Sequence, residues 1–341
     1  MTRKKICISL LLLGCLALAA AFVWGQQKAQ QPDQPQEDQG GFKIKTEVNM
    51  VSVPVTVHRT EGGFYKGLSQ NNFQVFEDGQ QQEIVFFTQE ALPTRIAIVL
   101  DISGSVLPEW GTIKYATKRF VESLKPDDQF SLTSFNTEIR LKMDWGRKTD
   151  KVDAVLGSIY CKGDTKLWDA VWVVCNDLFK GVKEKKAIII MSDGLDNDSA
   201  ISYDDMLAAA VRSEAAVYVV SKTEAVRQAY MADQNNSNFY YNRIPQDVFV
   251  QADLALRKLA YETGGRVLYP NSFGQLDNIY AQVDEELRNQ YTLGYISNNT
   301  IKDGSYRRID VRTNAQGAAI SARPGYYAPD EMRRPTVIKK W

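Results

Sequence analysis

The chain has 341 residues, of which 44% are hydrophobic and 24% are charged, and its 41 basic side chains balance 41 acidic ones. It carries no basic excess that could neutralise phosphates, so the composition offers no support for nucleic-acid binding. The single histidine, His58, argues against a zinc site of the ordinary kind and against Ser-His-Asp catalysis.

Residues 1–25 have the pattern of an export signal. A basic start, MTRKK, precedes an apolar run from Ile6 to Trp24, and small residues lead into a polar stretch. The run is also long enough for a retained membrane anchor, and Cys15 after LLG leaves a lipid anchor open. We favour a cleaved signal and predict a bacterial protein of the periplasm or cell envelope, or a secreted one, that meets the membrane only through such an anchor.

The chain then changes from a linker to β structure. Residues 26–41 are rich in Gln, Pro and Asp and are predicted to be a disordered linker. In residues 42–92, TEVNMVSVPVTVHR alternates as a strand does, and NFQVFEDGQQQEIVFFTQE is typical of a hairpin with Asp78-Gly79 at its turn. We expect this segment to form the first part of a β-sandwich.

Residues 93–289 alternate apolar strands with amphipathic helices. Strands are predicted at 95–101, 129–135, 138–143, 186–192, 216–221 and 266–269. Helices are predicted at about 109–125, 150–160, 166–181, 202–214, 250–263 and 275–289. This order predicts an α/β domain, with a doubly wound, mostly parallel sheet covered by helices on both faces.

β character returns in residues 290–328, with YTLGYIS, YRRIDVRT and AAISARPGYY. The economical prediction is one β-sandwich built from both flanks, with the α/β domain inserted between its two halves. Two separate small β units are the alternative, although each would bury little core. Residues 329–341 are expected to be a loose tail.

Oxygen-bearing side chains follow two of the apolar strands. In AIVLDISGSV, Asp101, Ser103 and Ser105 stand at every second position, and Asp193 ends the strand in IIIMSDG. Thr165, in GDTKLWDAV, enters a predicted helix. Ligands of open α/β sheets bind beyond the carboxyl ends of the strands, so these five side chains are expected to converge. Two carboxylates and three hydroxyls suit a hard cation, Mg²⁺ by preference, with Mn²⁺ or Ca²⁺ as substitutes.

These residues resemble the metal-ion-dependent adhesion site of the von Willebrand factor type A (VWA) family. That site has D-x-S-x-S followed by a separate Thr and a separate Asp, matched here by Asp101, Ser103, Ser105, Thr165 and Asp193. The resemblance covers roughly residues 94–289, and the flanks resemble bacterial secreted "VWFA-related" proteins. Asp164 departs from the pattern, because a second glycine is common there. The rest of the loop DGLDNDS lacks EF-hand spacing and is predicted to be solvated.

The resemblance implies binding rather than catalysis. An ion held by the five residues would keep one coordination position open for an Asp or Glu of a protein partner. The sequence has no G-x-S-x-G elbow and no phosphate-binding loop, so no enzyme is predicted. A structural envelope subunit with a merely stabilising metal is the alternative function, and a metal-assisted hydrolase is a distant third.

A long stretch, residues 223–250, interrupts the strand-helix alternation after the strand at 216–221. Loops of this length are usually functional or disordered. We predict that it emerges on the face of the metal site and selects the partner through exposed aromatic side chains. These are Tyr230, Phe239, Tyr240 and Tyr241. A floppy insertion without a role is the alternative.

Overall fold

The computed structural model describes residues 50–330 except residues 91, 148, 222–244 and 271. Residues 48–341 group into one compact unit. The predicted export signal and linker, residues 331–341 of the tail, and the four aromatic side chains of the long loop lie outside the described residues. Within the described ranges, none of the helices combines the length and hydrophobicity that crossing a bilayer requires.

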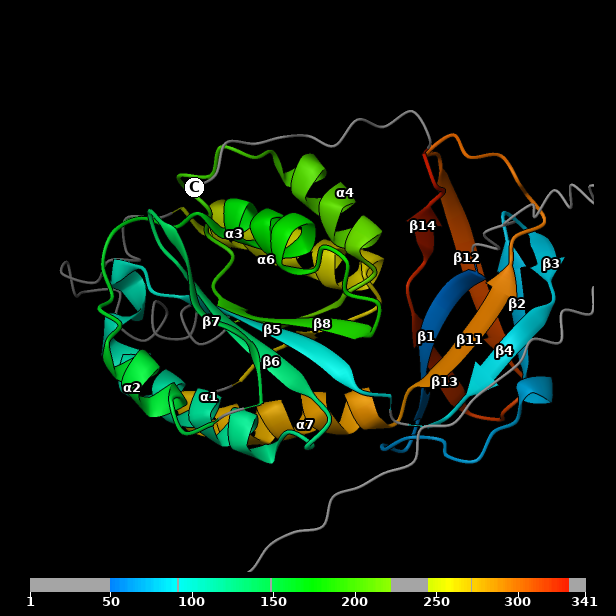
Figure 1. Cartoon of the computed structure of the whole chain (residues 1–341), viewed down its shortest axis with the longest axis horizontal. Coiled ribbons are helices and arrows are strands. Elements are labelled where there is room, and N and C mark those ends of the chain that lie inside the picture. Colours follow the sequence, from blue (N-terminus) through cyan, green and yellow to red (C-terminus); the bar gives the residue numbers. More distant parts are fainter. Residues whose placement is uncertain (1–49, 91, 148, 222–244, 271, 331–341) are drawn as a thin grey trace, which may run out of the picture. The chain divides into compact units, whose positions relative to one another are not determined.

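A six-stranded sheet with the order β10-β9-β8-β5-β6-β7 forms the centre of the α/β part (Figure 1). Its strands are β5 (Thr94–Asp101), β6 (Gln129–Phe135), β7 (Ile139–Gly146), β8 (Lys185–Ser192), β9 (Ala216–Ser221) and β10 (Val267–Leu268). All neighbours run parallel except β6 and β7, which pair antiparallel at one edge. β5 and β8 are apolar on both faces because helices cover both faces of the sheet.

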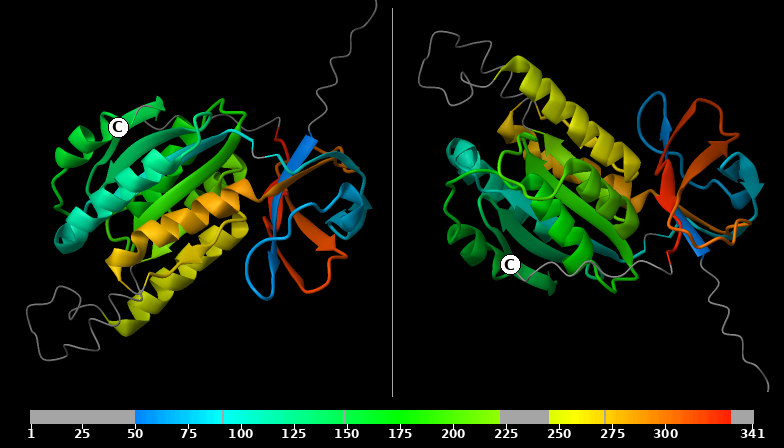
Figure 2. Two further views of the ribbon diagram at one scale, coloured as in Figure 1. Left: turned by 90° about the horizontal axis from the view of Figure 1, so that it is seen from below. Right: turned by 90° about the horizontal axis from the view of Figure 1, so that it is seen from above.

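The helices form two layers, one on each face of this sheet (Figure 1). One layer contains α1 (Trp110–Ser123), α2 (Val152–Gly157) and α7 (Leu276–Arg288). The other contains α3 (Leu167–Val173), α4 (Tyr203–Ser213) and α6 (Gln246–Glu262). Figure 2 shows the α7 side from below and the α6 side from above. Alternate residues of β5 supply the two cores: Ile98 packs into one and Val99 into the other.

Two four-stranded antiparallel sheets, β13-β1-β11-β4 and β14-β12-β2-β3, make a β-sandwich. The strands are β1 (Met50–Arg59), β2 (Phe73–Glu77), β3 (Gln80–Gln82), β4 (Ile84–Thr88), β11 (Tyr291–Ile296), β12 (Tyr306–Thr313), β13 (Ala318–Ala322) and β14 (Gly325–Tyr327). β1 pairs with β11, and β2 pairs with β12, so each sheet joins strands from before and after the α/β part. Both sheets contribute to one hydrophobic core. The predicted fold class, an α/β domain inserted between two halves of a sandwich, is confirmed.

The structure agrees with the predicted hairpin turn but differs from one predicted helix. The hairpin turn is confirmed, since Asp78 and Gly79 both have positive φ angles, 47° and 84°. The helix expected at 166–181 is helical over Leu167–Leu178, but α3 itself ends at Val173 and the chain continues directly as a π-helical turn over Val174–Leu178. Val174 and Cys175 continue the buried face of α3, which already contains Ala170 and Val171, at ordinary helical spacing.

Candidate metal centre

Asp101 and Asp193 lie at the carboxyl ends of two neighbouring strands of the sheet. Asp101 is the last residue of β5, and Asp193 directly follows β8, the parallel neighbour of β5. Each is only 2% exposed. A buried carboxylate is costly unless hydrogen bonds, a positive charge or a metal ion compensates it. The parallel pairing of two apolar strands therefore brings two buried carboxylates to one place.

Asp101 orders the loop that carries the two serines. Its Oδ1 accepts a hydrogen bond from the backbone N–H of Ser103 at 2.9 Å, and its Oδ2 accepts one from the Ser192 hydroxyl at 3.2 Å. Ser103 directly precedes a short 3₁₀ helix, Gly104–Glu109, which contains Ser105. The Oγ atoms of Ser103 and Ser105 lie 3.1 Å apart. The loop therefore presents two hydroxyl groups side by side, next to a buried carboxylate.

Backbone hydrogen bonds join this loop to the loop that carries Thr165. The N–H of Lys162 donates to the carbonyl of Ile102 at 2.9 Å, and the N–H of Gly104 donates to the carbonyl of Gly163 at 3.2 Å. Gly163 has a φ of +79°, a conformation that L residues rarely adopt. Gly163 thus contacts the serine loop, and the turn that it forms leads on to Thr165, just before α3.

The Thr165 loop is joined in turn to the loop after Asp193. Asn197 Oδ1 accepts the N–H of Thr165 at 2.8 Å, and the N–H of Asn197 donates to the carbonyl of Thr165 at 3.2 Å. The structure therefore interlinks the three loops that carry the five predicted ligands, Asp101, Ser103, Ser105, Thr165 and Asp193. Asp164, where the sequence departs from the family pattern, is exposed.

The expectation of a solvated loop after Asp193 holds for Asn197 and Asp198, which are exposed, but not for Asp196, which is half-buried. Asp196 caps α3, since its Oδ1 accepts the N–H of Leu167 at 2.7 Å. Burial raises the pKa of Asp196, although its hydrogen bonds act in the opposite direction. The polar side chains of this loop bind backbone groups across a gap of about thirty residues in sequence, which no local spacing rule reveals. The one sequence signal for this cap was the predicted start of a helix after Thr165, because the first N–H groups of a helix need acceptors.

The donor set fits a hard divalent cation. Adjacent ligands of an octahedral Mg²⁺ at its usual 2.0–2.1 Å lie about 2.9 Å apart, close to the 3.1 Å between the two serine hydroxyls. The Thr165 hydroxyl has no hydrogen-bond partner among the described residues and is available as a further ligand. In the same ranges, no group of three or more His, Cys, Asp or Glu side chains could hold a metal.

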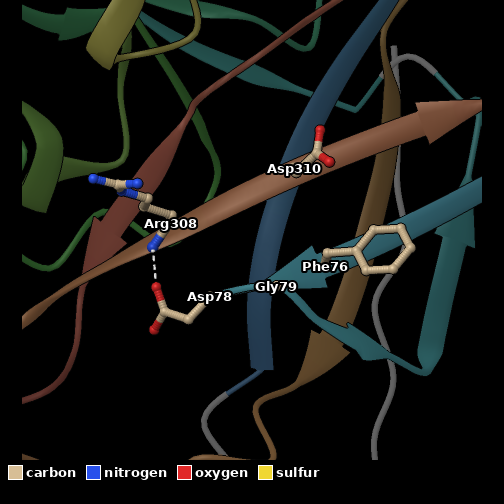
Figure 3. Close-up of a pocket in the computed structure, with 5 residues that line it drawn as sticks. All are labelled: Phe76, Asp78, Gly79, Arg308 and Asp310. Carbon is tan, nitrogen blue, oxygen red and sulfur yellow. Dashed lines mark hydrogen bonds between the residues drawn. The ribbon is translucent and has the colours of Figure 1, made fainter.

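A surface pocket occurs elsewhere, on the sandwich sheet that contains β2 and β12 (Figure 3). It is lined by Phe76, Asp78, Gly79, Arg308 and Asp310. The Asp78 carboxylate accepts the backbone N–H of Arg308 at 2.9 Å, and Asp310 pairs with Arg312 at 2.8 Å. Both carboxylates are thus used within the sheet, and we assign this pocket no ligand.

Comparisons with known proteins identify the α/β part. A family model described as von Willebrand factor type A domain matches residues 96–282. No curated protein matches the chain.

Solved structures with the same general fold share little sequence with this chain. A von Willebrand factor type A protein from Catenulispora acidiphila is 11% identical, with coverage of 86% of this chain and 78% of that one and a TM-score of 0.43. An aerotolerance-related membrane protein from Bacteroides fragilis is 16% identical, with coverage of 57% and 98% and a TM-score of 0.42. Proximal thread matrix protein 1 from the mussel byssus, described with a zinc-occupied MIDAS motif, is 16% identical with a TM-score of 0.44. The match covers 62% of this chain and 49% of the mussel protein, so the chain spans about half of it.

Proposed function

Because the chain belongs to the von Willebrand factor type A domain family, we propose that it is a protein-binding module that depends on a divalent cation. The observation that carries the proposal is the meeting of three hydrogen-bonded loops at the carboxyl edge of the sheet. These loops carry two buried carboxylates and three hydroxyl groups, and Asp101 and Asp193 stand at the carboxyl ends of two neighbouring strands. Such a donor set has the composition of a cation site.

Asp101, Ser103, Ser105, Thr165 and Asp193 would hold the ion, which we propose to be Mg²⁺, with Mn²⁺ or Ca²⁺ as substitutes. A bound ion supplies a positive charge with an open coordination position, which attracts a carboxylate. Asp101 would contribute charge and fix the serine loop through its bond to the Ser103 N–H. The serine and threonine hydroxyls would contribute neutral oxygens, so that the site keeps affinity for a further anion.

The partner we propose is a protein that presents an Asp or Glu side chain to this ion. Tyr230, Phe239, Tyr240 and Tyr241 of the long loop after β9 would add contacts that select among such partners. Because residues 1–25 have the pattern of an export signal, the binding would take place in the bacterial periplasm, at the cell envelope or outside the cell.

Calorimetric titration of Mg²⁺ and Mn²⁺ into metal-stripped protein tests the proposal. We expect saturable 1:1 binding to the wild type and its loss in the double variant Asp101→Ala/Asp193→Ala, because the two carboxylates provide the negative charge of the site. Asp150→Ala/Asp310→Ala, which removes two exposed carboxylates, is the matched control and should bind as the wild type does. A folded wild type that binds neither ion would overturn the proposal.

A structural role in envelope assembly is the second candidate, and an apolar patch on the sandwich favours it. Four exposed side chains make the patch: Met50, Val85, Phe86 and Ile296. Met50 pairs with Ile296, and Phe86 lies opposite Gly294 of the same strand. Association that persists in chelator and in Asp101→Ala, but is lost in Phe86→Ser, would identify the sandwich as the functional surface.

A further inference from the structure

Asn197 lies outside the five-residue motif, yet it makes hydrogen bonds to both backbone polar groups of one motif residue, Thr165. Its Oδ1 accepts the N–H of Thr165 at 2.8 Å, and its own N–H donates to the carbonyl of Thr165 at 3.2 Å. The N–H of Asp198 donates to the same carbonyl at 3.3 Å. Both backbone polar groups of Thr165 are therefore bound by one loop, and the position of the residue follows from the position of that loop.

The loop that holds Thr165 is the one that begins at Asp193, and α3 fixes its far end. Asp196 Oδ1 accepts the N–H groups of Leu167 at 2.7 Å and Trp168 at 3.3 Å. In return, Asp169 Oδ1 of α3 accepts the N–H groups of Ala200 at 3.0 Å and Ile201 at 2.8 Å. Reciprocal bonds of this kind leave the loop little freedom to move relative to the start of α3.

Thr165 needs such support more than the other proposed ligands do. Its hydroxyl group is neutral and has no hydrogen-bond partner in the described part of the chain, so only the backbone determines where the oxygen lies. Groups that orient metal ligands without touching the metal typically change metal affinity by about 10–100-fold when they are removed. An unanchored threonine would have to be ordered at the moment of binding, which weakens binding.

We propose that Asn197 is a positioning residue that sets the cation affinity of the site by holding Thr165 against the Asp193 loop. The inference rests on the proposed function, because it assumes that the cluster binds a divalent cation. It adds a residue that the five-position motif does not contain, and it names Thr165 as the ligand through which that residue acts.

The test compares Asn197→Ala with wild-type protein by calorimetric titration of Mn²⁺, together with thermal unfolding in chelator. We expect the dissociation constant to rise by about 10-fold or more, because the Thr165 N–H loses its partner. Asn197→Asp keeps the accepting oxygen and should restore most of the affinity. Asn176→Ala is the matched control, since Asn176 also bonds one backbone group, the carbonyl of Trp172 at 3.0 Å, but lies beyond the end of α3 that is far from Thr165.

The outcomes separate the inference from the function on which it rests. If the wild type does not bind Mn²⁺, the proposed function fails. If the wild type binds and Asn197→Ala binds equally well, the function stands and the inference is overturned. A lower unfolding temperature in chelator with unchanged affinity would also overturn it, because it would assign Asn197 a purely structural role. Weakened binding that Asn197→Asp restores would support it.

Discussion

The two cysteines in the described part of the chain differ in how far solvent reaches their thiols. Neither forms a disulfide; Cys161 is half-buried, and Cys175 is buried in the core under α3 and α4. Burial raises the pKa of the Cys175 thiol to about 12. Because the thiolate is the reactive form, Cys175 should be nearly inert in the folded protein.

Labelling with a chromogenic disulfide at pH 8 checks this difference. Cys161→Ser should lower the number of rapidly reacting thiols by one relative to the wild type. Cys175→Ser should leave that number unchanged, because Cys175 does not react until the protein unfolds. A loss of one fast-reacting thiol in Cys175→Ser would contradict the expected burial, and labelling in denaturant provides the total count for each variant.

At the residue scale, the sequence predicts the ligands of the candidate site better than their supports. Asp101, Ser103 and Ser105 form a spaced motif directly after an apolar strand, so they can be identified from local pattern alone. Asn197 could not be identified in this way, because its role depends on a contact with Thr165, 32 positions away. Its amide has no distinctive spacing, and the surrounding acidic residues are typical of a solvated loop.

At the element scale, one buried carboxylate joins the ends of three elements. Asp128 Oδ1 accepts the N–H of Thr94, the first residue of β5, at 2.9 Å. Its Oδ2 accepts the N–H of Lys125, just after α1, at 3.1 Å, and pairs with Arg288 at the end of α7. Asp128 thus fixes both points at which the chain enters and leaves the α/β part.

Asp128→Ala should therefore be strongly destabilising. It leaves the largely buried Arg288 guanidinium without this partner, and breaking a buried pair typically costs about 3–5 kcal/mol. We expect the free energy of unfolding in urea to fall by about 3 kcal/mol. Asp310→Ala breaks the exposed pair with Arg312 and should cost less than about 1 kcal/mol. An equal loss of unfolding free energy in the two variants would show that Asp128 does not stabilise the ends of these three elements as the geometry indicates.

The order of elements could be predicted because each strand and helix has its own local signal. β8 is a continuous apolar run, and α7 carries apolar residues at helical spacing. The pairing of β1 with β11 has no such signal, because register depends on which faces are buried in the finished sandwich. The π-helical turn after α3 has no local signal either, because Val174 and Cys175 continue the ordinary helical spacing of the buried residues of α3.

At the scale of the whole molecule, the sandwich and the α/β part share polar contacts as well as two chain connections. Arg323, 4% exposed, donates to the carbonyl of Ser52 at 2.6 Å and pairs with Glu214, at the end of α4, at 3.2 Å. Arg212 of α4 lies over the ring of Tyr327, 3.7 Å from its centre. These contacts should couple the unfolding of the two parts.

Differential scanning calorimetry of Arg212→Ala/Arg323→Ala tests the coupling. The wild type should unfold in one transition with equal calorimetric and van't Hoff enthalpies, whereas the variant should show two transitions or a van't Hoff enthalpy well below the calorimetric one. Arg140→Ala/Arg312→Ala removes two exposed arginines of the same parts and should keep the single transition. A single transition in both variants would show that Arg212 and Arg323 are not what couples the parts.

The insertion of the α/β part also affects the order in which the chain can fold. Thr88 of β4 and Thr292 of β11 are neighbours in one sheet although roughly 200 residues separate them, so the entropic cost of closing this loop must be met before they pair. An α/β part that folds first brings Thr94 and Arg288 together at Asp128 and thereby closes most of that loop. During synthesis, the apolar faces of β1, β2 and β4 stay uncovered until their pairing strands β11 and β12 have been made, roughly 200 residues later. Nascent chains are therefore expected to aggregate, or to bind chaperones, until β11 and β12 have left the ribosome.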